Sequence, residues 1–387
     1  MRIGIVSPYS FSIPGGVNQQ VLTHAKALAG KGHQVFVMGP GQLSQTQGFT
    51  FYSIGETVAF PFANGSTANI CLKLNDPKAI LKFISDQKIQ VIHMHEPLMP
   101  YANWFLLNRV TIPVLGTFHA FAQKNIPYQL MGWHLKKYFR KLSAVTAVSG
   151  PAHSMVSKFF NSDAKTQISV IPNCVSLSVP QPSVTNQFDW LRDGKKNILF
   201  LGRFEKRKGL DVLLDAVSGG VFHEKNIRLV VVGSGKTTHE TESVIANATQ
   251  KLGDRVAFLG KLNDADLSKV FEMSHVFVAP SLGGESFGVI LLEAIRAKIP
   301  VVASDIDGYR WVLEGEKHGL LSAPGDSKML AQTIDKLLKD EALRNTLISE
   351  SQKRLKMFDV NFVIEKYVNQ YESLVNASLS VDKSSKK

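Results

Sequence analysis

Hydrophobic residues occur in two recurring patterns along this chain. Short continuous apolar runs alternate with longer segments in which an apolar residue returns every three or four positions. Such runs are typical of strands buried in a parallel sheet, and the wider spacing predicts amphipathic helices. Together they predict an α/β fold with two doubly wound sheets. One series of strands is predicted at 3–7, 35–38, 91–95, 114–118, 144–148 and 169–171, and a second at 198–201, 229–232, 256–259, 276–279 and 301–303.

One segment, 174–196, interrupts this alternation. It contains two prolines and several serines with little periodicity, so we expect a linker there. The predicted domains are 1–173 and 197–360, and 387 residues are long enough for two cores. An amphipathic pattern at 361–378 predicts a helix that packs back on the first domain. Because ligands of doubly wound sheets bind beyond the carboxyl ends of the strands, we expect a site in a cleft between the domains.

The formal net charge is +12, from 44 Lys and Arg residues against 32 Asp and Glu. This excess favours acidic partners. No motif of a familiar nucleic-acid module is present, so we expect phosphorylated substrates and an anionic membrane surface, and no nucleic acid. Basic residues gather after Trp133, around Tyr138 and Phe139, as in a helix that lies on a membrane. A weaker basic group lies at 73–82; for both groups a solvated helix face is the alternative.

The N-terminus runs directly into the first predicted strand and lacks the apolar stretch of a signal peptide. No segment approaches the roughly 18 apolar residues of a membrane-spanning helix. Cys71 and Cys174 form neither a disulfide framework nor a metal-site pattern, which fits a reducing compartment. We therefore expect a cytoplasmic protein.

The most informative segment is 283–294, in which a glycine pair precedes Glu285 and seven residues separate this glutamate from Glu293. It follows a predicted strand, and we expect a helix to start near Ser286 or Phe287. The unpaired N–H groups of a helix N-terminus suit a phosphate. Both glutamates would then lie on one helix face, where they could hold one extended ligand. The alternative is a capped helix with a solvated glutamate.

Three other turns follow predicted strands. Gly15 and Gly16 precede the first helix, where glycines allow a phosphate to approach the backbone closely; a simple strand-to-helix turn is the alternative. The sequence there is not G-x-G-x-x-G, which argues against a nicotinamide dinucleotide. Arg203 and Lys208 flank a loop and could neutralise a diphosphate, with a solvated basic loop as the alternative. Gly233 ends a further strand and lets a ligand come close.

Three histidines, His93, His95 and His119, lie at the ends of predicted strands. A metal site is the less favoured interpretation, because no further ligand pattern such as H-E-x-x-H is present. We expect His119 to hydrogen-bond a substrate hydroxyl, and we expect no metal ligands.

Taken in order, these motifs resemble those of the retaining family 4 glycosyltransferases with the GT-B fold. The motifs are P-G-G-V at 14–17, T-F-H at 117–119, I-P-N at 171–173, G-R-x4-K-G at 202–209 and E-x7-E at 285–293. Within that family, further stretches resemble the bacterial phosphatidylinositol mannosyltransferases. These are 2–17, 61–66, 93–97 and 283–288.

The resemblance implies a GDP-mannose donor bound mainly by the second domain, and a phosphatidylinositol acceptor on the first domain at the inner membrane face. Catalytic roles are assigned to His119, Arg203, Lys208 and Glu285. Donor binding is assigned to Gly15, Gly16, Arg203, Lys208, Gly233, Leu262, Glu285, Ser286, Phe287, Gly288, Val289 and Glu293. Acceptor binding is assigned to Tyr9, Asn18, Asn64, Asn69 and Lys124. Asn18 and Asn69 stand where the family has glutamine and arginine, and Cys174 replaces the usual glycine of I-P-N-G.

The expected reaction proceeds with retention. Arg203, Lys208 and helix N-termini would stabilise the departing diphosphate, so neither a cofactor nor a metal is expected. No carboxylate is placed as a nucleophile, unlike the glycosidase pair, which favours a front-face reaction. The alternatives are a UDP-sugar-dependent transferase that acts on diacylglycerol or another lipid or sugar, an epimerase of the same fold that hydrolyses UDP-sugars, and a non-catalytic peripheral membrane protein.

Overall fold

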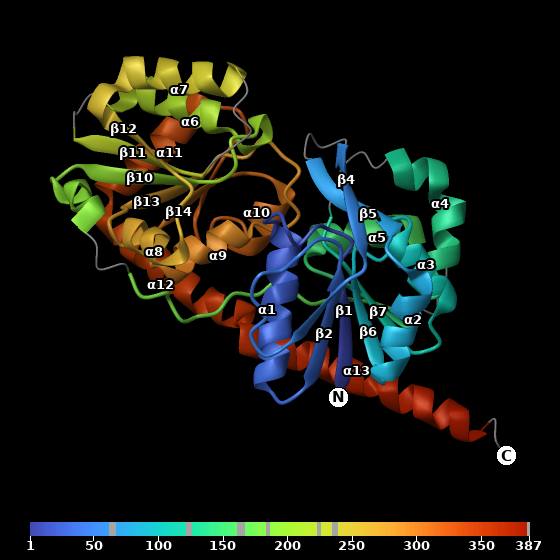
Figure 1. Ribbon diagram of the computed structural model, residues 1–387. Helices are drawn as coiled ribbons and strands as arrows, with labels where there is room; N and C mark the ends of the chain where they lie inside the picture. Colours follow the sequence, from blue (N-terminus) through green and yellow to red (C-terminus); the bar gives the residue numbers. More distant parts are fainter. Residues whose placement is uncertain are drawn as a thin grey trace. The chain divides into compact units, whose positions relative to one another are not determined.

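The computed structural model describes residues 1–61, 67–120, 126–160, 167–182, 186–222, 226–233 and 239–384. The chain divides into two compact units (Figure 1). The first comprises Met1–Val175 and Phe358–Lys387, and the second comprises Ser176–Met357. Each unit contains a parallel sheet covered by helices, as the apolar pattern predicts.

The first unit has a parallel sheet with strand order β3-β2-β1-β6-β7-β8-β9. A separate antiparallel hairpin is formed by β4 (Gly55–Pro61) and β5 (Thr67–Leu74). The strands of the parallel sheet are β1 (Arg2–Val6), β2 (Gln34–Gly39), β3 (Thr50–Ser53), β6 (Val91–His95), β7 (Val114–Phe118), β8 (Ala144–Ala147) and β9 (Ile168–Val170).

Successive residues of these strands point to opposite faces, so the sheet carries two cores. Val35 and Val37 of β2 pack in one apolar cluster, whereas Phe36 and Met38 pack in the other. The first face is covered by α1 (Gly16–Gly30) and α13 (Val360–Ser384). The opposite face is covered by α2 (Pro77–Asp86), α3 (Ala102–Arg109), α4 (Ile126–Phe139) and α5 (Gly150–Phe160).

Helix α13 belongs to the first unit although it follows the second in sequence. Tyr367 and Tyr371 are fully buried among α1 and the strands. The backbone of Val175 pairs with that of Phe358 at 3.0 Å where the chain re-enters the unit. The C-terminal amphipathic pattern therefore supplies one layer of the first core.

The second unit has strand order β12-β11-β10-β13-β14-β15. Ile198 and Phe200 of the central strand pack with α6, α7 and α11 in one core. The strands are β10 (Lys196–Leu201), β11 (Ile227–Val232), β12 (Val256–Gly260), β13 (Val276–Ala279), β14 (Val301–Ser304) and β15 (Leu320–Ser322). The helices are α6 (Leu210–Ser218), α7 (His239–Leu252), α8 (Asp264–Glu272), α9 (Val289–Arg296), α10 (Asp307–Leu313), α11 (Ser327–Lys339) and α12 (Glu341–Leu355).

The expected linker differs from the structure. Cys174 is buried in the first unit, and residues from Ser176 onward belong to the second. A 3-10 helix, Asn186–Arg192, buries Phe188 and Leu191 there. These apolar residues are too few to set up a periodicity, which is why the sequence suggested a linker.

Candidate active site

The loops that follow β10, β11, β12 and β13 meet at one edge of the second sheet, because parallel strands share the edge at which their carboxyl ends lie. They carry most of the predicted donor residues: Arg203 and Lys208 after β10, Gly233 after β11, Leu262 after β12, and Glu285 to Gly288 after β13. The sheet therefore brings together residues that are far apart in the sequence.

The centre of this edge is the Glu285 carboxylate, held by two cations. Arg207 Nη1 and Lys208 Nζ each lie 2.6 Å from Glu285 Oε1. The three side chains are only 13–16% exposed. Burial by itself would raise the pKa of the Glu285 carboxyl, but the charges and hydrogen bonds of Lys208 and Arg207 outweigh it and hold this pKa below its usual range. With the adjoining pair of Arg203 and Glu205, three cations face two carboxylates, and the single positive charge that remains suits an anionic ligand.

Sequence reasoning missed Arg207. Its guanidinium also contacts Glu205 at 2.8 Å, so it ties the loop after β10 to the loop after β13. The available signal was its place beside Lys208 in the basic loop. Arg203, by contrast, pairs with Glu205 at 2.8 Å, and 54% of its side chain is exposed.

The predicted start of the helix at Ser286 or Phe287 is wrong, since α9 begins at Val289. Gly288 precedes it with φ 102°, in the left-handed region that favours glycine, and a Cβ there would lie 2.6 Å from the Tyr309 ring. Glu285 therefore lies in the preceding loop, and only Glu293 lies on the helix.

Phe287, Ser286 and Glu293 lie around this helix start. Phe287 is buried beside Trp311, with ring centroids 5.5 Å apart, so its side chain supports the loop. Ser286 lies in the loop beside it. Burial raises the pKa of the half-buried Glu293. A carboxyl of this kind on α9 can accept hydrogen bonds from hydroxyl groups.

Leu262 lines a cavity of about 830 Å³ together with its neighbours 261–265, between the end of β12 and the start of α8. Gly233 lies at the adjacent strand end with φ 134°, and a Cβ there would lie 1.9 Å from the carbonyl oxygen of Gly202. Only glycine fits this approach of the β10 and β11 loops.

In the first unit, α1 begins at Gly16 with Gly15 as its N-cap, and no side chain caps it. Asn18, in the first turn of α1, is buried against the turn after β1: its Oδ1 accepts from Ser7 Oγ at 2.6 Å, and its Nδ2 donates to the Ser10 carbonyl at 2.8 Å. The Asn18 amide thus holds the turn, and its oxygen is engaged within the protein.

The other predicted acceptor residues lie close to this turn where the structure describes them. Tyr9 forms a β-bridge with Ile70, and the Ser10 N–H donates to the Asn69 carbonyl at 2.9 Å. Tyr9, Asn18 and Asn69 are therefore brought together at the end of β1. Two residues, Asn64 and Lys124, lie outside the described residues.

His119 follows β7 and is buried. Its Nε2 lies 2.7 Å from His95 Nδ1, and its backbone N–H donates to Glu96 Oε1 at 2.7 Å. The side chain of Asn173 also hydrogen-bonds His119. Burial lowers the pKa of His119 to about 3, so this imidazole is neutral at physiological pH.

One group of metal-ligand type occurs among the described residues. His24, His93 and His95 each place a ring nitrogen so that all three lie within 4.8 Å of one another. Both ring nitrogens of His93 are already hydrogen-bonded, to Tyr371 Oη at 2.7 Å and to Thr117 Oγ1 at 2.6 Å. No carboxylate joins the group to balance a buried cation. This arrangement favours a hydrogen-bonded histidine stack.

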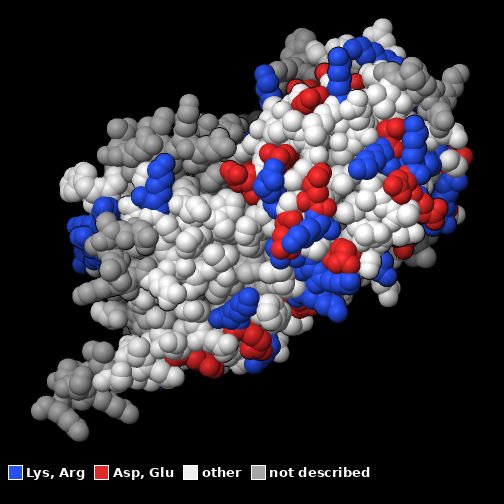
Figure 2. Space-filling view, turned by 180° about the vertical axis from the view of Figure 1, so that it is seen from behind, with Lys and Arg blue, Asp and Glu red and all other residues white. Residues whose placement is uncertain are grey.

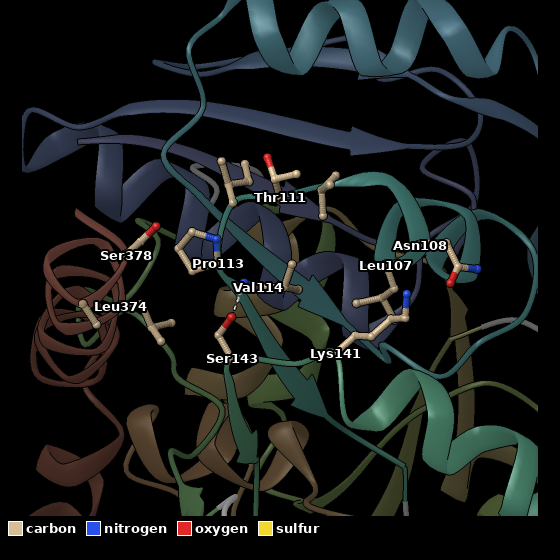
Figure 3. A pocket seen from close by; sticks show the side chains of 12 residues that line it. Leu107, Asn108, Thr111, Pro113, Val114, Lys141, Ser143, Leu374 and Ser378 are labelled. Carbon is tan, nitrogen blue, oxygen red and sulfur yellow. Dashed lines mark hydrogen bonds between the residues drawn. The ribbon is translucent and has the colours of Figure 1, made fainter. Parts of the chain in front are cut away.

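Figure 3 shows a cavity of about 530 Å³ in the first unit. Leu107, Val114 and Leu374 contribute apolar surface, and Lys141 is its charged residue. The Val114 N–H donates to Ser143 Oγ at 3.1 Å beside it. Since Val114 begins β7 and His119 follows the other end, this cavity is remote from the predicted site.

The predicted membrane helix needs a correction. Tyr138 and Phe139 of α4 are buried in the core, which leaves Trp133, 80% exposed, as the aromatic residue near the basic side chains. In the weaker group, Lys82 pairs with Asp86 at 2.6 Å. On the face in Figure 2, Lys and Arg side chains are interspersed with Asp and Glu. No helix in the described part of the chain is long and apolar enough to cross a membrane.

Comparison with known proteins identifies the family of this chain. Residues 14–179 match the family described as Glycosyltransferase Family 4, and residues 185–354 match Glycosyl transferases group 1. The chain is 32% identical over 386 residues to the Phosphatidyl-myo-inositol mannosyltransferase of Mycobacterium leprae, covering 98% of this chain and 99% of that protein. The chain belongs to the family 4 glycosyltransferases. The enzyme of the same name from Mycolicibacterium smegmatis is 32% identical over 383 residues, covering 98% of this chain and 96% of that protein.

Solved structures confirm the GT-B fold of this glycosyltransferase. A glycosyltransferase from Rickettsia africae has a TM-score of 0.74 at 18% identity, covering 97% of this chain and 98% of that one. The structure of Anabaena Alr3699/HepE in complex with UDP has a TM-score of 0.74 at 18% identity, covering 96% of this chain and 100% of that one. The sequence-based prediction of a GT-B glycosyltransferase is thus confirmed.

Proposed function

We propose that this glycosyltransferase transfers mannose from GDP-mannose to phosphatidylinositol, with retention, at the cytoplasmic face of the membrane. The observation that carries the proposal is the identity of 32% over nearly the whole of both chains to proteins named phosphatidyl-myo-inositol mannosyltransferase. The Arg207–Glu285–Lys208 cluster supports it, because at one edge of the second sheet it joins two cations to a carboxylate that can accept hydrogen bonds from a sugar.

In the proposed mechanism, negative charge develops on the diphosphate as its bond to the sugar breaks. Lys208 and Arg207 lie where they can stabilise that charge, and Arg203 is exposed and can turn to a phosphate. In many enzymes, preorganised charges of this kind make the largest contribution to stabilising the transition state. The backbone N–H groups at the start of α9 add a positive dipole.

Glu285 serves a different part of the donor. Its Oε1 binds both cations, so the other carboxylate oxygen can accept hydrogen bonds from sugar hydroxyls. Its depressed pKa keeps it ionised, and a carboxylate held by two cations is a weak nucleophile. This supports a front-face reaction in which the leaving phosphate helps to deprotonate the acceptor hydroxyl. Glu293 and Leu262 would contact the ribose and the base.

The membrane part of the proposal depends on exposed basic residues near Trp133. Vesicles rich in anionic lipid should bind the protein, and added salt should release it, because exposed charges are screened. Trp133→Ala should weaken binding without changing turnover of a water-soluble acceptor. Equal binding to neutral vesicles would contradict this part.

A direct assay tests the transfer. The purified protein is incubated with radiolabelled GDP-mannose and vesicles containing phosphatidylinositol, and label in the lipid fraction is counted. We expect label in the lipid, an α-anomeric product by NMR, and loss of at least ~100-fold in turnover for Lys208→Ala. Undiminished turnover in Lys208→Ala would show that Lys208 has no part in the mechanism. Absence of labelled lipid with the wild type would contradict phosphatidylinositol as the acceptor.

One observation favours a second candidate. Asn69 beside Tyr9 supplies no positive charge where the relatives' acceptor phosphate is expected to need one. Transfer to a lipid without a phosphate, such as diacylglycerol, is therefore the alternative, and UDP-glucose with diacylglycerol vesicles forms the second arm of the assay.

A further inference from the structure

His119 stands at the end of a row of buried histidines. His93 and His95 are two residues apart on β6, so their side chains lie on the same face of the sheet. Ring centroids are 4.3 Å apart between His93 and His95 and 5.0 Å between His95 and His119. His24 of α1 packs against the row, 5.6 Å from the His95 ring. Each of these side chains is at most 6% exposed.

The direction of the hydrogen bond between His95 and His119 follows from what surrounds His95. One of the two nitrogens, His95 Nδ1 or His119 Nε2, must carry the hydrogen, since they lie 2.7 Å apart. The other His95 nitrogen, Nε2, is buried without a partner among the described residues. A buried N–H without an acceptor is rarer and costs more than an unused lone pair. The hydrogen therefore belongs on His95 Nδ1, which donates to His119 Nε2.

We propose that His95 is a positioning residue that holds His119 as the neutral tautomer with its hydrogen on Nδ1. The Nδ1–H is then the donor of the His119 ring, and an oxygen of a bound sugar would share it with the Asn173 side chain, which hydrogen-bonds His119. The Nε2 lone pair is occupied and cannot take a proton from the acceptor. The inference rests on the proposed function for the substrate contact of His119. It assigns that residue to orientation of the sugar and excludes it as a general base.

The backbone of His119 is held by other groups. Glu96 Oε1 accepts from the N–H of His119 at 2.7 Å and from that of Ala120 at 2.6 Å. The Glu96 carbonyl in turn accepts from Asn103 Nδ2 at 2.9 Å. A change at His95 therefore removes one hydrogen bond of the His119 ring, keeps the one to Asn173 and leaves the backbone in place, which makes the effects on ring and backbone separable.

Histidine NMR tests the tautomer directly. With ¹⁵N-labelled histidine, the chemical shifts of the ring nitrogens report which one carries the hydrogen. We expect Nδ1–H for His119 in the wild type and a shift toward Nε2–H in His95→Leu, which removes the donor. His95→Asn should restore the wild-type signal, because its amide places an N–H near the original Nδ1. An unchanged His119 signal in His95→Leu would overturn the proposal.

Kinetics in two backgrounds separates positioning from stability. If His95 acts through His119, His95→Leu lowers kcat/KM by ~10–100-fold in the wild type and by less than ~2-fold in His119→Ala. His24→Leu is the matched control: it removes a buried imidazole of the same row without touching the His95–His119 bond, so the His119 signal should stay unchanged. Equal losses from His95→Leu in both backgrounds would show a purely structural role.

The two readouts also keep this inference apart from the proposed function. A wild type that transfers no mannose would refute the function, whereas the NMR experiment would still decide the tautomer.

Discussion

Replacing Arg207 by methionine gives the sharpest test of the cluster around Glu285. The side chain is 14% exposed and its guanidinium contacts Glu285 at 2.6 Å and Glu205 at 2.8 Å. Removing one partner of a buried ion pair lowers the free energy of unfolding by ~3–5 kcal/mol. Glu285 keeps Lys208 as a partner, so we expect Arg207→Met to lower it by about 2 kcal/mol. In a unit the size of Ser176–Met357, that loss lowers the melting temperature by ~4–8 °C.

Scanning calorimetry measures this shift, with and without ~0.5 M salt. The loss should persist in salt, because partly buried pairs are screened much less than exposed ones. Lys82→Met is the matched control: its pair with Asp86 is also 2.6 Å long, but the side chains are 74% and 54% exposed, so the expected cost is below ~0.5 kcal/mol. If Arg207→Met and Lys82→Met lower the melting temperature equally, the Arg207–Glu285–Lys208 cluster does not stabilise the second unit.

Three further predictions concern buried groups. Burial lowers the pKa of His24 to about 4 from 6.5, so the folded state binds fewer protons than the unfolded state between these values. The free energy of unfolding should be at its full value above pH ~6.5 and should fall as the pH drops toward 4, and thermal melts across that range measure this. Burial raises the pKa of Cys71 to about 11 and that of Cys174 to about 12, so a thiol reagent should modify neither in the native protein at pH ~8 and both after unfolding. Gly288→Ala should lower the free energy of unfolding in urea by ~2–4 kcal/mol, because the position combines a positive φ with steric overlap. Gly315→Ala, where φ is 70° and the space is open, should lower it by only ~1 kcal/mol, and equal losses for the two variants would contradict the overlap.

The strands that position the site were predictable because each is a continuous apolar run. Val276–Ala279 and Val301–Ser304 are buried on both faces, so their local sequence suffices. The hairpin Gly55–Pro61 and Thr67–Leu74 was missed, since its residues mix polar and apolar side chains without such a run. The three-residue strand Leu320–Ser322 is too short to give a pattern.

Within the site, glycines and charged residues at strand ends could be recognised as candidates, but their partners could not. Arg207 lies 78 residues before Glu285, and Tyr371 lies 278 residues after His93. The start of α9 was misplaced for a similar reason: Gly288 precedes the helix in a left-handed conformation, packed against the ring of Tyr309 from α10.

The sequence by itself determined the α/β class, the two sheets, the edge at which ligands are expected and the glycosyltransferase family, because periodicity, glycine turns and short motifs are local. Only the tertiary structure decided how the charges are shared. It placed Glu285 between Arg207 and Lys208 and joined His95 to His119, since each of these contacts depends on strands that become neighbours only when the sheet forms.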